Sequence, residues 1–134
     1  MLEVHARLLP VLDDELRASI GLSLSEFDVL YQLWIRPRGR LRMKRLAAAL
    51  LVTPSGVTRI VSRLERGRLV QRISRAGEQA VDAELTAAGR ERVAAAMEVH
   101  FAGVRRHFID LLSDDETAAL TTLWRRIGGE PDAG

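Results

Sequence analysis

The sequence predicts a mainly α-helical, single-domain protein that carries one small β-wing. Apolar residues recur every three or four positions over most of the chain, as they do along the buried face of a helix. Only residues 69–73 and 81–85 alternate between apolar and polar side chains as strands do. A tip that contains Gly77 separates these two segments, so they are expected to pair as a hairpin. The length of 134 residues suits one domain.

Two helices are predicted in the first 35 residues. The first spans residues 2–20, where Pro10 either lies in the first turn of a shorter helix or kinks a longer one, and Gly21 ends it. Ser23 and Glu26 have the spacing of a capping box, which predicts a second helix that runs to about residue 35. The apolar side chains of this second helix are spaced for burial: Phe27, Leu30, Tyr31 and Trp34.

A helix, a tight turn and another helix follow. After an arginine-rich turn, residues 41–42 fit a very short strand, and a third helix is expected over residues 43–50. The fourth helix begins at Thr53, whose hydroxyl can cap it, and Pro54 follows where a missing N–H costs nothing. Gly67 stands where a left-handed cap is expected at the end of this helix.

The fourth helix divides into an apolar face and a basic face with hydroxyl groups, and it carries no acid before Glu65. Such a face suits the major groove of DNA, where Ser and Thr reach base edges or phosphates and Arg grips guanine or phosphate. An ordinary surface helix with a solvated basic face is the alternative. The basic face consists of Ser55, Thr58, Arg59, Ser62, Arg63 and Arg66.

The distribution of charge favours the nucleic-acid interpretation. The net charge is only +2, yet between Arg36 and Arg75 the only acid is Glu65 among twelve basic residues. A basic middle between acidic ends is typical of a module that binds a polyanion. The chain has no cysteine, which excludes disulfides and thiolate zinc sites, and it shows no signal peptide and no apolar run of about 20 residues. A soluble, cytoplasmic protein is expected.

The C-terminal third predicts two further helices. Thr86 caps a long amphipathic helix that is expected to reach about residue 112, on the order of 40 Å. A small domain cannot bury such a helix alone, so a partner chain is expected to cover part of it. Ser113 and Glu116 form a second capping box before the last helix, and a short tail begins at Gly128. The last helix presents Leu120, Leu123, Trp124 and Ile127.

The ordered set of motifs resembles the MarR family of bacterial transcription regulators over nearly the whole chain. The resemblance implies a winged helix-turn-helix lobe over residues 23–85 and dimerisation helices over residues 1–20 and 86–128. The segments that carry it are residues 22–30, similar to the opening of the family's second helix, residues 46–65, similar to its helix-turn-helix, and residues 67–70 and 85–90, which resemble the two ends of its wing.

The resemblance further implies a homodimer that binds a pseudo-palindromic operator in double-stranded DNA, with no cofactor. In this interpretation the Thr53 helix lies in the major groove, and a small aromatic or apolar effector releases a repressor. An effector pocket is expected near Leu16, Tyr31 and Trp34, although core packing is the more common role for such a tryptophan. The residues expected to contact DNA are Arg42, Lys44, Thr53, Pro54, Ser55, Thr58, Arg59, Ser62, Arg63, Arg72 and Arg75.

The wing departs from the family pattern, which usually ends in an Asp-x-x-Asp-Arg-Arg-like tip. Here Glu78 and Gln79 stand where arginines are expected, and a glutamate is repelled by the negative potential of a narrow minor groove. Weaker or differently specified DNA binding is therefore expected, with Arg75 substituting from nearby and Arg72 holding a phosphate. The alternative function is a winged-helix protein-interaction module with weakened or lost operator binding.

Neither an enzyme nor a metal site is predicted. The sequence has no GxSxG, Gly-rich phosphate loop or HExxH motif, and its carboxylates do not form a catalytic set with its serines. His100 and His107 lie two turns apart on the long predicted helix, and no tight cluster of His and Glu accompanies them.

Overall fold

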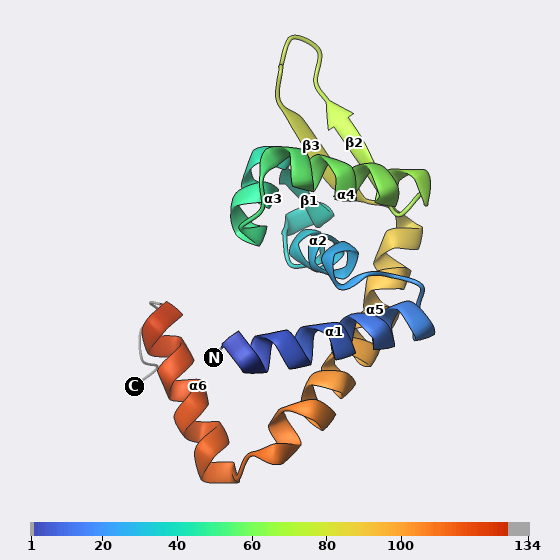
Figure 1. Cartoon of the computed structure of the whole chain (residues 1–134). Helices are drawn as coiled ribbons and strands as arrows, with labels where there is room; N and C mark the ends of the chain where they lie inside the picture. Colours follow the sequence, from blue (N-terminus) through green and yellow to red (C-terminus); the bar gives the residue numbers. More distant parts are fainter. Residues whose placement is uncertain (1, 129–134) are drawn as a thin grey trace.

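The computed structural model describes residues 2–128, a mainly helical chain with a small antiparallel sheet, as predicted (Figure 1). Gly128 belongs to the last helix, and the rest of the predicted tail lies outside the described residues. The elements are α1 (Leu2–Ser19), α2 (Leu24–Trp34), the 3-10 helix η1 (Pro37–Gly39), β1 (Arg40–Arg42), α3 (Met43–Leu50), α4 (Pro54–Arg66), β2 (Val70–Ser74), β3 (Val81–Leu85), α5 (Ala87–His107), the 3-10 helix η2 (Ile109–Leu111) and α6 (Asp114–Gly128).

The sheet has three strands in the order β1-β3-β2, all antiparallel. β2 and β3 form the predicted hairpin, whose tip projects beyond α3 and α4 in Figure 1. The predicted short strand is confirmed as β1, where Leu41 pairs with Ala83 on the free side of β3. The hairpin is therefore the wing, and β1 joins it to the start of α3.

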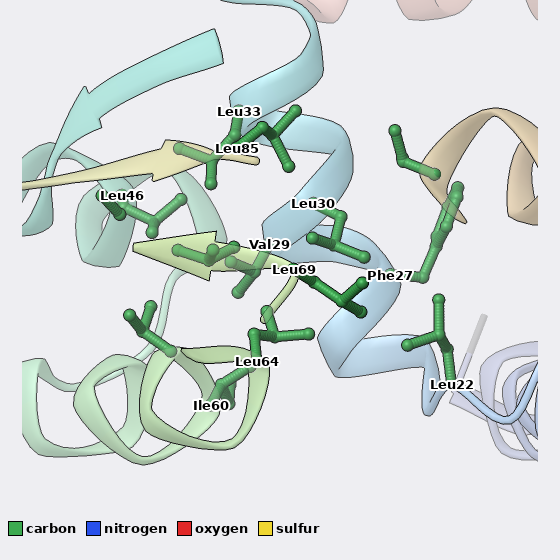
Figure 2. Close-up of a cluster of buried hydrophobic side chains, with 14 of the residues drawn as sticks. Leu22, Phe27, Val29, Leu30, Leu33, Leu46, Ile60, Leu64, Leu69 and Leu85 are labelled. Carbon is green, nitrogen blue, oxygen red and sulfur yellow. The ribbon is translucent and has the colours of Figure 1, made fainter. Parts of the chain in front are cut away.

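The core of the lobe forms around α2, which supplies the fully buried side chains of Val29, Leu30 and Leu33. They meet Leu46 from α3 and Leu64 from α4 in one contiguous cluster (Figure 2). Each fully buried Leu of this kind contributes roughly 1.5–3 kcal/mol of hydrophobic stabilisation. This packing fixes which face of α4 points inward, and so which face remains for a ligand.

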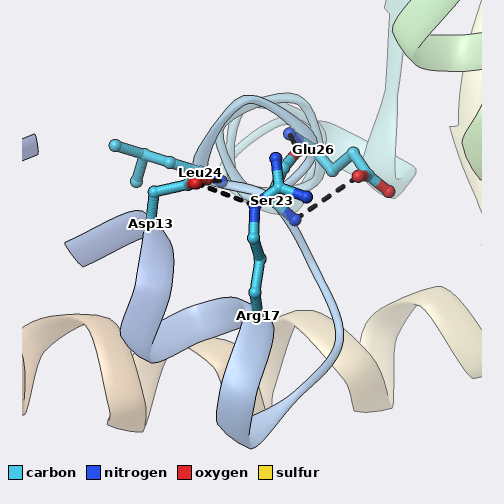
Figure 3. Close-up of polar contacts among 5 residues, drawn as sticks. All are labelled: Asp13, Arg17, Ser23, Leu24 and Glu26. Carbon is cyan, nitrogen blue, oxygen red and sulfur yellow. Dashed lines mark hydrogen bonds and ion pairs between the residues drawn. The ribbon is translucent and has the colours of Figure 1, made fainter. Parts of the chain in front are cut away.

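The start of α2 is held by a capping box and by α1 (Figure 3). Ser23 Oγ accepts a hydrogen bond from the Glu26 backbone N–H (3.0 Å), and Glu26 Oε1 accepts one from the Ser23 N–H (3.3 Å), as predicted. Asp13 Oδ1 on α1 accepts from the Leu24 N–H (2.8 Å), while Arg17 donates to its other oxygen (2.7 Å). The Leu24 N–H first, and then Arg17, hold the pKa of Asp13 below its ordinary value.

The wing passes directly into α5 through a tight contact. Thr86 Oγ1 caps α5 by accepting from the Gly89 N–H (3.0 Å), as predicted, and it donates to the Arg68 carbonyl (2.7 Å). The Thr86 N–H donates to the Leu69 carbonyl (3.1 Å). A Cβ at Gly89 would lie 2.0 Å from that same carbonyl oxygen, so only glycine allows α5 to start here. The start of α5 is thereby clamped to the chain that leaves α4.

The end of α4 differs from the prediction by one residue. Gly67 is the C-cap residue, with φ −77°, whereas the left-handed residue is Arg68, at φ +59°. The Leu69 N–H donates to the Leu64 carbonyl (3.0 Å) and the Arg68 N–H to the Glu65 carbonyl (3.0 Å). This pair of bonds is the Schellman motif, and it places Arg68 rather than the glycine at the left-handed position.

The long C-terminal helix is shorter than predicted. α5 ends at His107, about 31 Å from its start. Phe108 leaves the helical conformation (φ −135°, ψ −63°), and η2 turns the chain into α6. The apolar periodicity continues through Phe108 and Leu111, so periodicity alone cannot show this break. The Ser113–Glu116 capping box that starts α6 is confirmed.

Two expectations about single residues are resolved by the fold. Pro10 lies inside α1, which continues through it to Ser19, so the longer-helix alternative is confirmed. Trp34 was expected to pack in the core, which is wrong, because its side chain is 37% exposed. Val29 and Leu33 complete the buried face of α2 instead, and that face turns Trp34 outward.

Candidate nucleic-acid interface

The candidate recognition surface is the outer face of α4. Thr53 Oγ1 accepts from the Gly56 N–H (3.1 Å) and Pro54 occupies the first helical position, which confirms the predicted start of the helix. The apolar face is buried in the lobe, as predicted, and consists of Val57, Ile60, Val61 and Leu64. Burial of that face leaves the opposite face of the helix in solvent.

The exposed face combines hydroxyl groups near its start with guanidinium groups along its length. The Thr58 hydroxyl donates to the Pro54 carbonyl (2.8 Å), and the Thr53 and Ser55 hydroxyls lie 3.2 Å apart. Three arginines of this face have no carboxylate within 4.0 Å among residues 2–128, so their donors are available to phosphates or base edges. They are Arg59, Arg63 and Arg66.

The only acid of α4 is neutralised from the wing. Arg72 on β2 donates its Nη1 to Glu65 Oε1 (3.1 Å) and its backbone N–H to Glu65 Oε2 (3.1 Å). Its Nη2 reaches Ser62 Oγ (2.8 Å) and the Thr58 carbonyl (3.1 Å). We call this set of contacts the Arg72 clasp. Sequence reasoning assigned Arg72 to a phosphate, whereas its guanidinium here binds α4, cancels the charge of Glu65 and orients Ser62.

The acidic residue of the wing tip also has a partner inside the chain. Glu78 Oε2 lies 3.7 Å from Arg42 Nη2, and Arg42 Nε donates to Asp82 Oδ1 (3.3 Å). Arg42 is therefore shared between two carboxylates. Lys44, in the first turn of α3, is exposed, and in the described part of the chain it has no carboxylate within 4.0 Å.

A groove of about 560 Å³ lies between the wing tip and the start of α3. Sequence reasoning singled out Arg42 and Arg75 but missed the groove, because its residues converge from η1, β1, α3 and the wing. The run of arginines between residues 36 and 45 was the available signal. We call this feature the arginine groove, and it is lined by Arg36, Pro37, Arg38, Arg40, Leu41, Arg42, Arg45, Arg75 and Asp82.

The three residues expected around an effector lie in different environments. Leu16 is fully buried in the core, Tyr31 is half-buried, and Trp34 is on the surface. The Tyr31 ring lies 5.9 Å from that of Phe27 and 6.2 Å from that of Phe101, at the contact between α2 and α5. Leu16 therefore acts as a core residue in this conformation, and Tyr31 belongs to an aromatic cluster.

His100 joins the same aromatic cluster from α5. Its ring centroid lies 4.7 Å from that of Phe27, and its buried Nδ1 has no hydrogen-bond partner among residues 2–128. Burial lowers the pKa of His100 below the ordinary value of 6.5, because desolvation disfavours the charged imidazolium. Within residues 2–128, no three His, Asp or Glu side chains lie close enough to hold a metal ion. No helix in that range is both long and apolar enough to cross a membrane.

Comparisons with known proteins agree with this geometry. Residues 20–79 match a family model described as MarR family. AbsC, a MarR family transcriptional regulator from Streptomyces coelicolor, is 31% identical over 96% of this chain and 86% of its own, with a TM-score of 0.84. Sco3205, a MarR family regulator from the same organism in complex with DNA, is 28% identical over 98% of this chain and 84% of its own (TM-score 0.85).

More distant structures share the fold. MarR from E. coli in complex with operator DNA is 20% identical over 94% of this chain and 89% of its own, with a TM-score of 0.79. The comparison with curated proteins found no match.

Proposed function

Because the chain belongs to the MarR family, we propose that it is a homodimeric transcriptional repressor that binds a specific DNA sequence and is released by a small ligand. The observation that carries the proposal is the outer face of α4. Its arginines are unpaired within the described residues, and its single acid is held by the Arg72 clasp. On an ordinary solvated helix face we would expect acidic residues among the basic ones, so a face without them favours a polyanionic partner.

The proposed binding mode places α4 in the major groove. The groove of B-DNA is about 12 Å wide and admits one helix with its side chains. The hydroxyls of Ser55 and Thr58 then lie near base edges, and Arg59 and Arg63 reach guanine or phosphate further along the helix. The full predicted contact set, with Lys44 at the start of α3 and the wing residues, belongs to this proposal.

A second copy of the chain is the proposed partner of the terminal helices. α6 has no buried residue among those described, and most of its apolar side chains remain in solvent. Leu123 and Trp124 are each 51% exposed, and Ile127 is 67% exposed. An apolar face of this kind indicates a protein interface. A symmetric dimer would present two α4 helices about 34–36 Å apart, one turn of DNA, which accounts for a pseudo-palindromic operator.

Release by a small aromatic or apolar ligand is proposed at the contact between α2 and α5. The half-buried Tyr31 and the 47% exposed Phe101 offer ring surfaces there. A ligand that binds better when α2 has shifted against α5 would move the population toward a dimer whose α4 helices no longer match the operator.

The experiment that tests the proposal is fluorescence anisotropy with duplex DNA from the region upstream of the protein's own gene, against a scrambled duplex, at several salt concentrations. Arg59→Ala and Arg63→Ala are each expected to cost about 1–3 kcal/mol of binding to the upstream duplex. Arg105→Ala, which removes an exposed arginine from α5, is the matched charge control. Because α5 belongs to the proposed dimer contact, size-exclusion chromatography first establishes that its oligomeric state is that of the wild type, and its affinity should then be unchanged.

Equal, weak binding to both duplexes, unaffected by the α4 variants, would contradict operator recognition. That result would favour the alternative, a winged-helix interaction module, for which the acidic wing tip is the motivating observation.

A further inference from the structure

The arginine groove lies at the β1 edge of the sheet, whereas the recognition helix packs beside the β2 edge. In the sheet order β1-β3-β2, α4 packs beside β2, whereas α3 packs beside β1 at the other edge. The groove opens at this β1 edge, because its lining residues come from η1, β1, the start of α3 and the wing. It is therefore a surface separate from the outer face of α4, and it shares Arg42 and Arg75 with the proposed DNA contact set.

Only part of the positive charge in the groove is neutralised within the protein. Arg40 pairs with Glu84, and Arg42 pairs with Asp82 and Glu78. The other four guanidinium groups of the groove have no carboxylate within 4.0 Å in the described part of the chain. They are Arg36, Arg38, Arg45 and Arg75.

The backbone holds one of these arginines in an unfavourable conformation. Arg38 is left-handed (φ +60°, ψ +11°), and Gly39 follows at φ +63°. Any residue with a Cβ would be strained at the φ of Gly39, so the turn favours glycine there. Conformations of this kind are costly for residues other than glycine and are concentrated at functional sites. The turn has the effect of keeping Arg38 in the groove beside like charges.

We propose that the arginine groove is a second anion site that binds two or more adjacent phosphate groups. These four guanidiniums, from three segments, have no carboxylate partner in the described part of the chain, and only Arg36 donates to a neutral side chain, Gln32 Oε1 (3.4 Å). Their like charges repel one another, and a multiply charged anion between them would relieve that repulsion. Guanidinium forks match phosphate oxygens through paired N–H donors. The volume of about 560 Å³ is larger than one monoanion requires. The phosphates would come either from a free oligophosphate or from the DNA backbone outside the half-site, and this second source rests on the proposed function.

The first arm of the test uses the full chain without DNA. Isothermal titration calorimetry with inorganic tripolyphosphate compares wild type with a groove variant, Arg36→Ala/Arg38→Ala/Arg45→Ala. The matched control, Arg59→Ala/Arg63→Ala/Arg66→Ala, removes the same charge from α4. We expect one tripolyphosphate per chain, bound at least about tenfold more weakly by the groove variant and within about twofold of wild type by the control. The arginine side chains that the two variants remove are exposed in the wild-type protein, and thermal melts verify that both variants fold.

The second arm measures the salt dependence of duplex binding, with flanks that extend beyond the half-sites and without them. If the groove holds backbone phosphates, the groove variant loses about 0.9 from the salt slope for each phosphate contact removed, and only on the longer duplex. A loss in the calorimetric arm alone identifies a free oligophosphate, and a loss in both arms identifies the DNA backbone as the source of the phosphate.

A groove variant that matches wild type in both arms, or tripolyphosphate binding that only the α4 control abolishes, would overturn the proposal. Failure of the wild-type protein to bind any duplex would contradict the proposed function. The calorimetric comparison of wild type with the groove variant would then be the test of the groove site.

Discussion

The Arg72 clasp makes a prediction that separates two roles for one arginine. Arg72→Ala removes the partner of the Glu65 carboxylate and the donor to Ser62 Oγ, both of which lie on or next to the DNA-facing side of α4. If the clasp is correct, the variant weakens DNA binding by exposing a negative charge on that side. If Arg72 instead binds a phosphate directly, the variant weakens binding by removing a contact.

The size of the effect follows from the exposure of the pair. The side chains of Arg72 and Glu65 are 28% and 41% exposed, so solvent screens their interaction. We therefore expect a stability loss of about 1 kcal/mol, or roughly 3–5 °C in Tm. A freed carboxylate about 8 Å from a phosphate is repelled by about 0.5 kcal/mol in water. Two or three phosphates then weaken binding roughly five- to tenfold.

The assay is anisotropy with operator duplex for wild type, Arg72→Ala and the double variant Arg72→Ala/Glu65→Ala. The double variant removes the freed charge, so its Kd should return to within about twofold of wild type. A double variant that binds as weakly as the single variant would refute the clasp and would support the other role, in which Arg72 binds a phosphate directly. Because the repulsion is electrostatic, the penalty of Arg72→Ala should also shrink as salt is raised.

Gly89→Ala should destabilise the protein by about 2–4 kcal/mol in thermal or urea unfolding, because its Cβ meets the Leu69 carbonyl oxygen at 2.0 Å, whereas Gly128→Ala, with no atom within 4 Å, serves as a neutral control. The lowered pKa of His100 means that the unfolded chain binds its proton first, so stability should be full above pH 6.5 and fall as the pH drops below it. His100→Phe should flatten that part of the pH–stability profile measured by urea unfolding, and an unchanged slope would contradict the assignment. Glu78→Arg, which reverses the charge of the exposed wing tip, should tighten binding to duplex DNA by roughly fivefold at low salt, and an unchanged Kd would place the tip away from the duplex.

Most of the fold follows from local signals in the sequence. The capping residues Ser23, Thr53 and Thr86 each mark the start of a helix, because their hydroxyls accept from an N–H only three residues away. The wing strands were visible through alternation with period two. The break after His107 was not visible, because apolar spacing continues across it. The exposure of Trp34 was missed for a related reason. Helical spacing shows which residues share a side of α2, but it does not show which of two adjacent sides packs into the core.

The candidate site was predictable only in part. The basic face of α4 is a property of one helix, so residues such as Arg59 and Arg63 could be named from their spacing. The Arg72 clasp and the arginine groove join residues that are distant in sequence, and only the folded chain shows that Arg72 meets Glu65 or that Arg75 approaches Arg36.

The contacts between Thr86 and the chain that leaves α4 couple the orientation of α5 to the position of the recognition helix. α4 cannot tilt relative to the start of α5 without breaking the Thr86 bonds to Arg68 and Leu69. Over the roughly 31 Å of α5, a rotation of about 6° at its far end displaces α4 by about 3 Å. That distance is close to the rise of one base pair, about 3.4 Å. A change of a few degrees where the two chains of the proposed dimer meet would therefore shift recognition by a full step along the operator.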